Sequence, residues 1–203
     1  MSFKQSIINS IEENKNAFSS EEFAFYAFTG KTENNVRDKI AFSLHNEITK
    51  NNHKDTFVMR EWKNKTGTRS DIAIVKIENN TEIPLAIIEI KAKANSKVTD
   101  LKEAAALLEN DLAKAKVAAK AETEIYLIFI CTLYKRNNAD LLFMKQYLTK
   151  SKELEKTELE SEWERQIKNT SFKTPSLLTF LEKGNFRKST VEYCIFVYGP
   201  HLK

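Results

Sequence analysis

The sequence has few of the residues that bind zinc or form disulfide bridges. It contains two cysteines and three histidines among 203 residues. Cys131 and Cys194 lie in separate apolar, strand-like segments, and no CxxC pair is present. This scarcity argues against a zinc site or a disulfide framework and predicts two reduced, buried thiols.

Glycine and proline are also scarce, with four and three residues respectively. No glycine-rich Walker or Rossmann motif occurs, so ATP-driven translocation would need an accessory protein, which could also provide targeting. No segment rich in Pro, Gly or Ser divides the chain, and its turns must use Asn, Lys, Thr and Ser instead. We therefore expect a single domain over residues 1–203.

Long hydrophobic runs are absent. The longest, near Ile125–Leu133, is too short to cross a bilayer, and the first residues lack the apolar stretch of a signal peptide. The net charge is +4 and 30% of the residues are charged. We expect a cytoplasmic protein with no membrane partner, and a charge that is compatible with DNA but does not single it out.

Hydrophobic periodicity predicts alternating helices and strands. The expected helices are 3–15, 20–28, 33–50 and 97–120, and the expected strands are Thr56–Lys63, Ser70–Glu78, Pro84–Ala92 and 124–133. A helix between the third and fourth strands indicates a parallel pair. The fold class is therefore α/β, with a central mixed β-sheet flanked by helices.

The C-terminal part is expected to form a largely helical extension over 139–199. A charged stretch at 139–168 and a shorter segment at 175–183 read as helices, and Thr190–Tyr198 reads as a last strand. These elements could extend the sheet or pack beside it, and the sequence leaves both open.

Two carboxylates and a lysine occupy corresponding places on neighbouring predicted strands. Side chains alternate between the faces of a strand, so Leu85, Ile87, Glu89 and Lys91 share one face. If the preceding strand pairs with this one through a turn at Asn79-Asn80, its start lies beside the end of the other strand. Asp71 then meets Glu89 and Lys91.

This cluster has the chemistry of a divalent-metal site. An ionised carboxylate at the end of an apolar strand is costly unless it is paired or metal-bound, and two adjacent carboxylates repel each other. Hard oxygen ligands favour Mg²⁺, or Mn²⁺ in its place. A metal held by Asp71 and Glu89 could activate water for phosphodiester hydrolysis, while Lys91 orients the water and neutralises developing charge.

These residues carry a resemblance to a known family. Ser70-Asp71-Ile72-Ala73-Ile74 and, further on, Ile88-Glu89-Ile90-Lys91 resemble the motif of the PD-(D/E)xK, or restriction-endonuclease-like, nuclease superfamily. Ser70 replaces the usual proline. The resemblance covers a core of about 33–133. It implies a restriction-endonuclease-like fold and Mg²⁺-dependent endonuclease cleavage of DNA, as in restriction, repair, recombination or phage defence.

The resemblance also implies a further acidic residue at the site. Glu47 on the preceding helix is a candidate, with Glu33 and Asp38 behind it. Glu61 on the first strand is the other candidate. The sequence ranks Glu61 and Glu47 nearly equal.

Basic residues flank the motif. Arg60, Lys63, Lys65 and Arg69 precede Asp71, and Lys93 follows Lys91; all five could contact DNA phosphates, with Arg69 the best candidate. An ordinary solvated loop is the equal alternative. The charged residues of the 97–120 helix, Asp111 among them, read as a solvated face.

The sequence is also compatible with other functions. The same residues could form surface salt bridges at a sheet edge, or belong to a catalytically inactive nuclease-fold module that binds DNA or another protein. A metal-dependent RNase is a third reading. Cutting both strands of a duplex needs two sites, which would suit a C2 homodimer.

Overall fold

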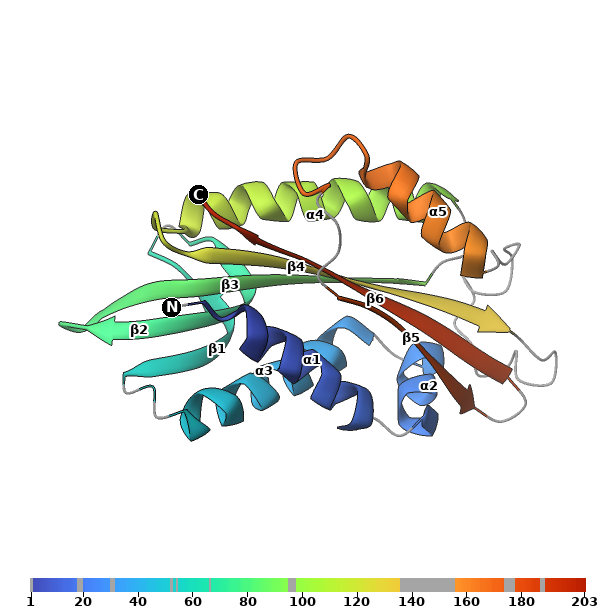
Figure 1. Ribbon diagram of the computed structural model, residues 1–203, viewed down its shortest axis with the longest axis horizontal. Coiled ribbons are helices and arrows are strands. Elements are labelled where there is room, and N and C mark those ends of the chain that lie inside the picture. The colour runs from blue at the N-terminus through green and yellow to red at the C-terminus, as the bar shows by residue number, and fades with distance from the viewer. Residues whose placement is uncertain are drawn as a thin grey trace.

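The computed structural model describes residues 2–17, 20–29, 32–51, 53, 55–65, 67–94, 98–135, 156–173, 178–186 and 189–203 (Figure 1). Its helices are α1 (Lys4–Ala17), α2 (Ser20–Thr29), α3 (Thr32–Lys50), α4 (Val98–Ala118) and α5 (Lys156–Ile167). Its strands are β1 (Thr56–Lys63), β2 (Arg69–Glu78), β3 (Thr81–Ala94), β4 (Glu124–Lys135), β5 (Leu178–Phe186) and β6 (Ser189–His201).

The six strands form one mixed, curled sheet with the order β1-β2-β3-β4-β6-β5. Among the described strands only β3 and β4 are parallel, and α4 connects them, as a parallel pair requires. The other neighbours are antiparallel. The prediction of an α/β fold with a central mixed sheet and flanking helices is therefore confirmed.

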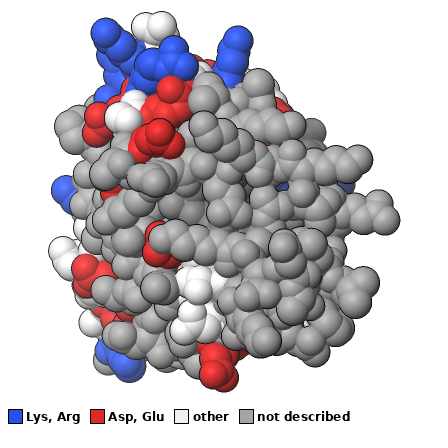
Figure 2. Space-filling view, turned by 90° about the vertical axis from the view of Figure 1, so that its right-hand side faces the viewer, with Lys and Arg blue, Asp and Glu red and all other residues white. Residues whose placement is uncertain are grey.

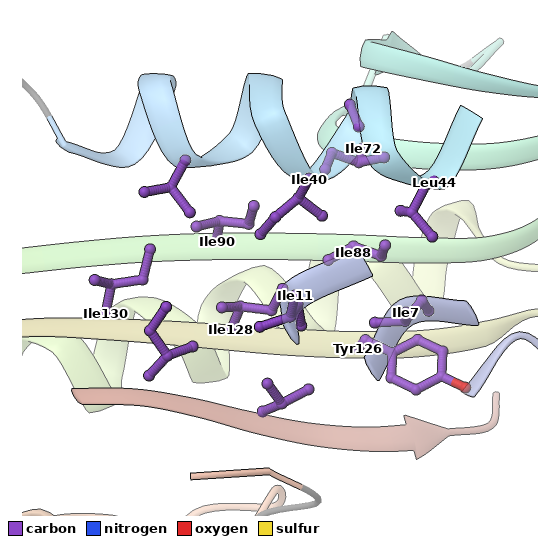
Figure 3. Close-up of a cluster of buried hydrophobic side chains, with 14 of the residues drawn as sticks. Ile7, Ile11, Ile40, Leu44, Ile72, Ile88, Ile90, Tyr126, Ile128 and Ile130 are labelled. Carbon is purple, nitrogen blue, oxygen red and sulfur yellow. The ribbon is translucent and has the colours of Figure 1, made fainter. Parts of the chain in front are cut away.

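Helices cover both faces of the sheet (Figure 1). On one face, α1 and α3 pack against a layer made mostly of isoleucines, several of them with no exposed surface. Figure 3 shows Ile40 and Leu44 of α3 above Ile88 of β3, with Ile7 of α1 and Ile128 of β4 in the same cluster. Side chains of this kind, buried on alternate positions of adjacent strands, fix the register of the central strands.

On the other face, α4 and α5 cover a second core with more aromatic residues. Trp163 of α5 stacks on Phe129 of β4 with ring centroids 4.1 Å apart. Its indole nitrogen donates a hydrogen bond of 2.7 Å to the hydroxyl of Tyr198 in β6. This face, hereafter the α4 face, also carries the candidate site.

The β1–β2 hairpin curls over the α4 face. Trp62 pairs with Ser70 in the strand ladder. Its indole nitrogen nevertheless donates a 2.7 Å hydrogen bond to Glu82, near the start of β3 and far from Ser70 along the hairpin. A flat hairpin would hold these side chains roughly 20 Å apart, so the strands must bend. The bend is at Glu61, whose φ of 50° is unusual for a residue other than glycine.

The C-terminal part differs from the prediction. Residues 178–186, expected to belong largely to a helix at 175–183, form β5, and together with β6 they extend the sheet beyond β4. The charged stretch at 139–168 contains helix α5, which begins at Lys156 and ends at Ile167. Residues 139–155 lie outside the described residues. The described C-terminal extension is thus one helix and two strands.

Helix α5 has the exposed, charged outer face expected from its sequence. Arg165 forms two hydrogen bonds of 2.9 and 2.7 Å with the carboxylate of Glu162. Figure 2 shows basic and acidic side chains intermixed at the top of the molecule, seen from the right-hand side of Figure 1. Across the described part of the chain, every helix is too short or too polar to span a membrane.

Candidate functional site

The pairing of β2 with β3 brings Asp71 beside Glu89. The ladder ends at the pair Ile72 and Ile88, so the next residues, Asp71 and Glu89, lie opposite each other. The turn between the strands has positive φ values at Asn79 (48°) and Asn80 (58°), which suits a tight hairpin. Asp71 therefore lies near Glu89 as the sequence predicts, although a bulge between Ile74 and Val75 shifts the register that the turn alone would give.

Beyond this point β2 and β3 separate, and carboxylates replace the missing strand partner. Asp71 Oδ2 accepts a hydrogen bond of 2.8 Å from the backbone nitrogen of Ile90. Two residues further on, Glu33 Oε2 accepts one of 3.0 Å from the backbone nitrogen of Ala92. Glu33 lies in the first turn of α3, so the start of that helix reaches the same edge of β3.

Glu89 is a buried carboxyl with little compensation. Its residue is 5% exposed, and it projects to the α4 face, where its ladder partner on β4 is the buried Leu127. Burial first, and then the nearby charge of Asp71, raise the pKa of Glu89 from its ordinary value of 4.5 to about 8. Asp111 adds to the rise, while Ser70 and Lys91 oppose it. A bound cation would relieve this penalty.

Lys91 is held by an acidic residue of α4. Its Nζ lies 2.9 Å from Oδ2 of Asp111, whose side chain is only 12% exposed. Burial lowers the pKa of Lys91, but the contact with Asp111 and the charges of Glu33 and Asp71 raise it more, and the net shift is upward. The lysine is therefore an ammonium ion at neutral pH, which suits charge neutralisation and not general base catalysis.

Asp111 is the residue that the sequence analysis missed. Read as part of a solvated helix face, it is instead buried, with 8% of its surface exposed. A signal was present, because Asp111 follows Leu108 by three positions and precedes Ala115 by four, on the buried stripe of α4.

The two ranked candidates for a further acid lie outside this group. Glu61 sits opposite Asp71 in the β1–β2 register, but its side chain turns to Arg37, with a contact of 2.9 Å. Glu47 lies fourteen residues after Glu33 on α3, about 21 Å along the helix, and its carboxylate accepts a 3.5 Å hydrogen bond from Asn51. The structure brings Glu33 to the site, and neither Glu61 nor Glu47.

Most of the predicted DNA-contacting residues are engaged in ion pairs. Arg60 contacts Asp38 at 2.9 Å, and Lys93 contacts Glu103 of α4 at 3.1 Å. Arg69 lies 3.8 Å from Glu61 and is 68% exposed at its side chain. The remaining two, Lys63 and Lys65, line a pocket near the end of α4.

The donor set fits a magnesium-type ion better than a zinc ion. Within the described residues, no group of three or more His, Cys, Asp or Glu side chains is arranged to hold a metal. Asp71 and Glu89 form a pair of carboxylates, and Mg²⁺ characteristically uses one or two carboxylates and keeps several waters. A cation at this pair would offset the burial of the Glu89 carboxyl, which Ser70 and Lys91 offset only in part.

Comparisons with protein-family models, with curated proteins and with solved structures found no match to this chain.

Proposed function

We propose that this protein is a Mg²⁺-dependent endodeoxyribonuclease with a restriction-endonuclease-like core. The observation that carries the proposal is the placement of Asp71 near the buried Glu89, with Lys91 on the same face two residues further along β3. The sequence resemblance supplies DNA as the substrate class. The pair of carboxylates supplies the independent physical reason for a divalent metal.

Each residue has a distinct role in this proposal. Asp71 and Glu89 would hold Mg²⁺, or Mn²⁺ in its place. When bound, the ion supplies a Lewis acid that lowers the pKa of water and neutralises charge on the phosphoryl oxygens. Lys91 presents its ammonium to the phosphate as a fixed positive charge. In the hydrolysis, a water oxygen bonds to phosphorus, the bond from phosphorus to the leaving oxygen breaks, and that oxygen takes up a proton.

Two further acids complete the proposed site. Asp111 orients Lys91 through the 2.9 Å ion pair. Glu33, whose carboxylate reaches the edge of β3, takes the place expected for Glu61 or Glu47. From this position Glu33 can contribute an oxygen ligand to the metal, or it can hold a water molecule beside Asp71 and Glu89.

Cleavage of supercoiled plasmid by the purified protein tests the proposal. The expected result is nicking or linearisation with Mg²⁺ or Mn²⁺, none with EDTA, and none by the Glu89→Gln variant. Glu13→Gln, which changes an exposed acid of α1, is the matched control and should cleave as the parent protein does.

The same assay separates the competing functions. Binding of DNA without cleavage under any metal would point to an inactive nuclease-fold module. Cleavage of RNA but not of DNA would make the protein a ribonuclease. Cleavage that persists in Glu89→Gln would overturn the assignment of the site. Double-strand cutting with a dimer in solution would fit a C2 pair of sites.

A further inference from the structure

A pocket on the α4 face is lined by three lysines from three separate segments. Lys63 ends β1, Lys65 lies in the β1–β2 turn, and Lys120 follows α4. The pocket encloses about 460 Å³, and its walls include Pro84 and Val117. The curl of the β1–β2 hairpin creates it, because this curl carries Lys63 and Lys65 towards the end of α4.

These lysines differ from the other basic residues near the site. Arg60, Lys93 and Lys114 each contact a carboxylate at 3.3 Å or less. Within the described part of the chain, the side chains of Lys63, Lys65 and Lys120 form no such ion pair, and all three residues are exposed. Glu78 interacts electrostatically with Lys120. The pocket is thus a concentration of positive charge that the protein neutralises only in part.

The pocket wall has one acidic residue, and that residue is already engaged. Glu82 accepts a 2.7 Å hydrogen bond from the indole nitrogen of Trp62. Asn80 and Thr81 of the β2–β3 turn add polar side chains to the lining. Three ammonium groups, against this carboxylate and the neighbouring Glu78, favour an anionic ligand with several acceptor oxygens, such as a phosphate.

The pocket lies on the same face of the sheet as the candidate metal site. Lys63 pairs with Arg69, two residues before Asp71 on β2. Val117 in the pocket wall follows Asp111 by six residues on α4. A single DNA molecule lying across the α4 face could therefore reach both places.

We propose that this lysine pocket binds the DNA backbone at a phosphate other than the one that is cut. The proposal rests on the proposed nuclease function and adds a second contact that positions the substrate. Lysines suit this role because a point charge binds any backbone phosphate without reading the base sequence. The pocket sets where the duplex lies on the enzyme and contributes a salt-dependent part of the affinity.

The test compares two triple variants by fluorescence anisotropy with a 30-base-pair duplex in EDTA. The pocket variant is Lys63→Gln, Lys65→Gln and Lys120→Gln. The control variant, Lys4→Gln, Lys168→Gln and Lys173→Gln, removes the same charge from exposed lysines elsewhere. The pocket variant should bind at least about tenfold more weakly at moderate salt, and its salt slope should fall by about 1 to 3. Equal losses in the two variants would overturn the pocket assignment.

Substrate length gives a second readout. In the presence of Mg²⁺, the pocket variant should cleave a long duplex with a raised KM and nearly unchanged kcat. On duplexes that end two base pairs from the cut, it should match the parent protein. An equal loss of cleavage on long and short duplexes would mean that the lysines do not act by binding a phosphate away from the cut.

The outcomes distinguish the two proposals. A parent protein that neither binds nor cuts DNA would remove the proposed function, and the pocket assignment with it. A parent that cuts DNA while the pocket variant binds normally would remove the pocket assignment alone. If inorganic phosphate, but not DNA, shifted the amide signals of Val117 and Lys120, the pocket would belong to a free anion instead.

Discussion

Two clusters of charged residues adjoin Asp71. Acidic residues outnumber basic residues in the first cluster, and basic residues outnumber acidic residues in the second. On the α4 face, Asp71, Glu89 and Asp111 meet only two lysines, Lys91 and Lys114. On the β1 side of the sheet, Asp38 and Glu61 meet three arginines: Arg37, Arg60 and Arg69.

The difference separates a candidate cation site from a structural ion-pair network. Acids are in excess in the first cluster, which is largely buried, and Glu89 has a raised pKa there. In the second cluster each acid has at least two arginine partners, and the acids are 42% and 48% exposed at their side chains. Buried, unbalanced negative charge is what a metal ion would correct.

Removing the charge of Glu89 should have the largest effect. Glu89→Gln is expected to lower the rate of Mg²⁺-dependent DNA cleavage by about a thousandfold or more, because the metal contributes several kcal/mol to the transition state. Glu61→Gln, in the other cluster, should cleave within about twofold of the parent. Initial rates on a supercoiled plasmid measure both. Equal losses in the two variants would erase the distinction between the clusters.

The second expected effect is on metal-free stability. Because the pKa of Glu89 is raised to about 8 on folding from 4.5, the unfolded chain loses this proton first as pH rises. The group therefore destabilises the fold increasingly between about pH 4.5 and pH 8, by up to about 5 kcal/mol. Below that window it contributes no such penalty.

Urea unfolding in EDTA at several pH values measures this effect. The stability of Glu89→Gln relative to the parent should rise by a few kcal/mol across that window, and Mg²⁺ should stabilise the parent but not the variant. The Glu61→Gln comparison should be flat. A flat comparison for Glu89→Gln would mean that the carboxyl is not penalised by burial.

Much of the site could be predicted from local patterns. Glu89 and Lys91 follow from strand alternation within an apolar run, and Asp71 follows from the Asn79-Asn80 turn, because each of these signals is short-range. A bulge between Ile74 and Val75 changes the register further along, and Leu85 packs against the opposite core from Ile87. Asp71 and Glu89 both lie on the far side of that bulge from the turn. Their relative position therefore depends on the turn and on the bulge together.

The remaining features depend on tertiary structure. Whether Glu33 or Glu47 reaches β3 depends on how α3 is placed along the sheet, and the helix pattern contains no such information. The turn of Glu61 towards Arg37 depends on a single positive φ. The segment of β5 becomes a strand because it pairs with β6 at the edge of the sheet. Its own sequence pattern does not reveal that partner, and the prediction of a helix there is wrong.

Asp111 provides the third comparison. Asp111→Asn should lower kcat about 10- to 100-fold with little change in KM, because Lys91 loses the group that orients it. Asp111→Glu should recover part of the loss. The matched control is Glu103→Gln, which breaks the similar but more exposed pair with Lys93. A loss confined to KM, or an equal effect in the control, would assign Asp111 a purely structural role.

The smallest effect is expected in the arginine cluster. Asp38→Asn removes contacts with the largely buried Arg37, which keeps its contact with Glu61, and with the exposed Arg60. Solvent-exposed ion pairs contribute about 1 kcal/mol or less. The free energy of unfolding should change by no more than that, and cleavage should be unaltered. A loss of cleavage with unchanged stability would move this cluster into the functional site.

Binding of Mn²⁺, followed by electron paramagnetic resonance in the absence of DNA, tests the central claim most directly. The parent protein should bind the ion with an affinity that falls below pH 8, as Glu89 becomes protonated. Glu89→Gln and Asp71→Asn should each lose this binding, and Glu61→Gln should retain it. Unchanged Mn²⁺ binding in Glu89→Gln would contradict the assignment of Asp71 and Glu89 as the metal site.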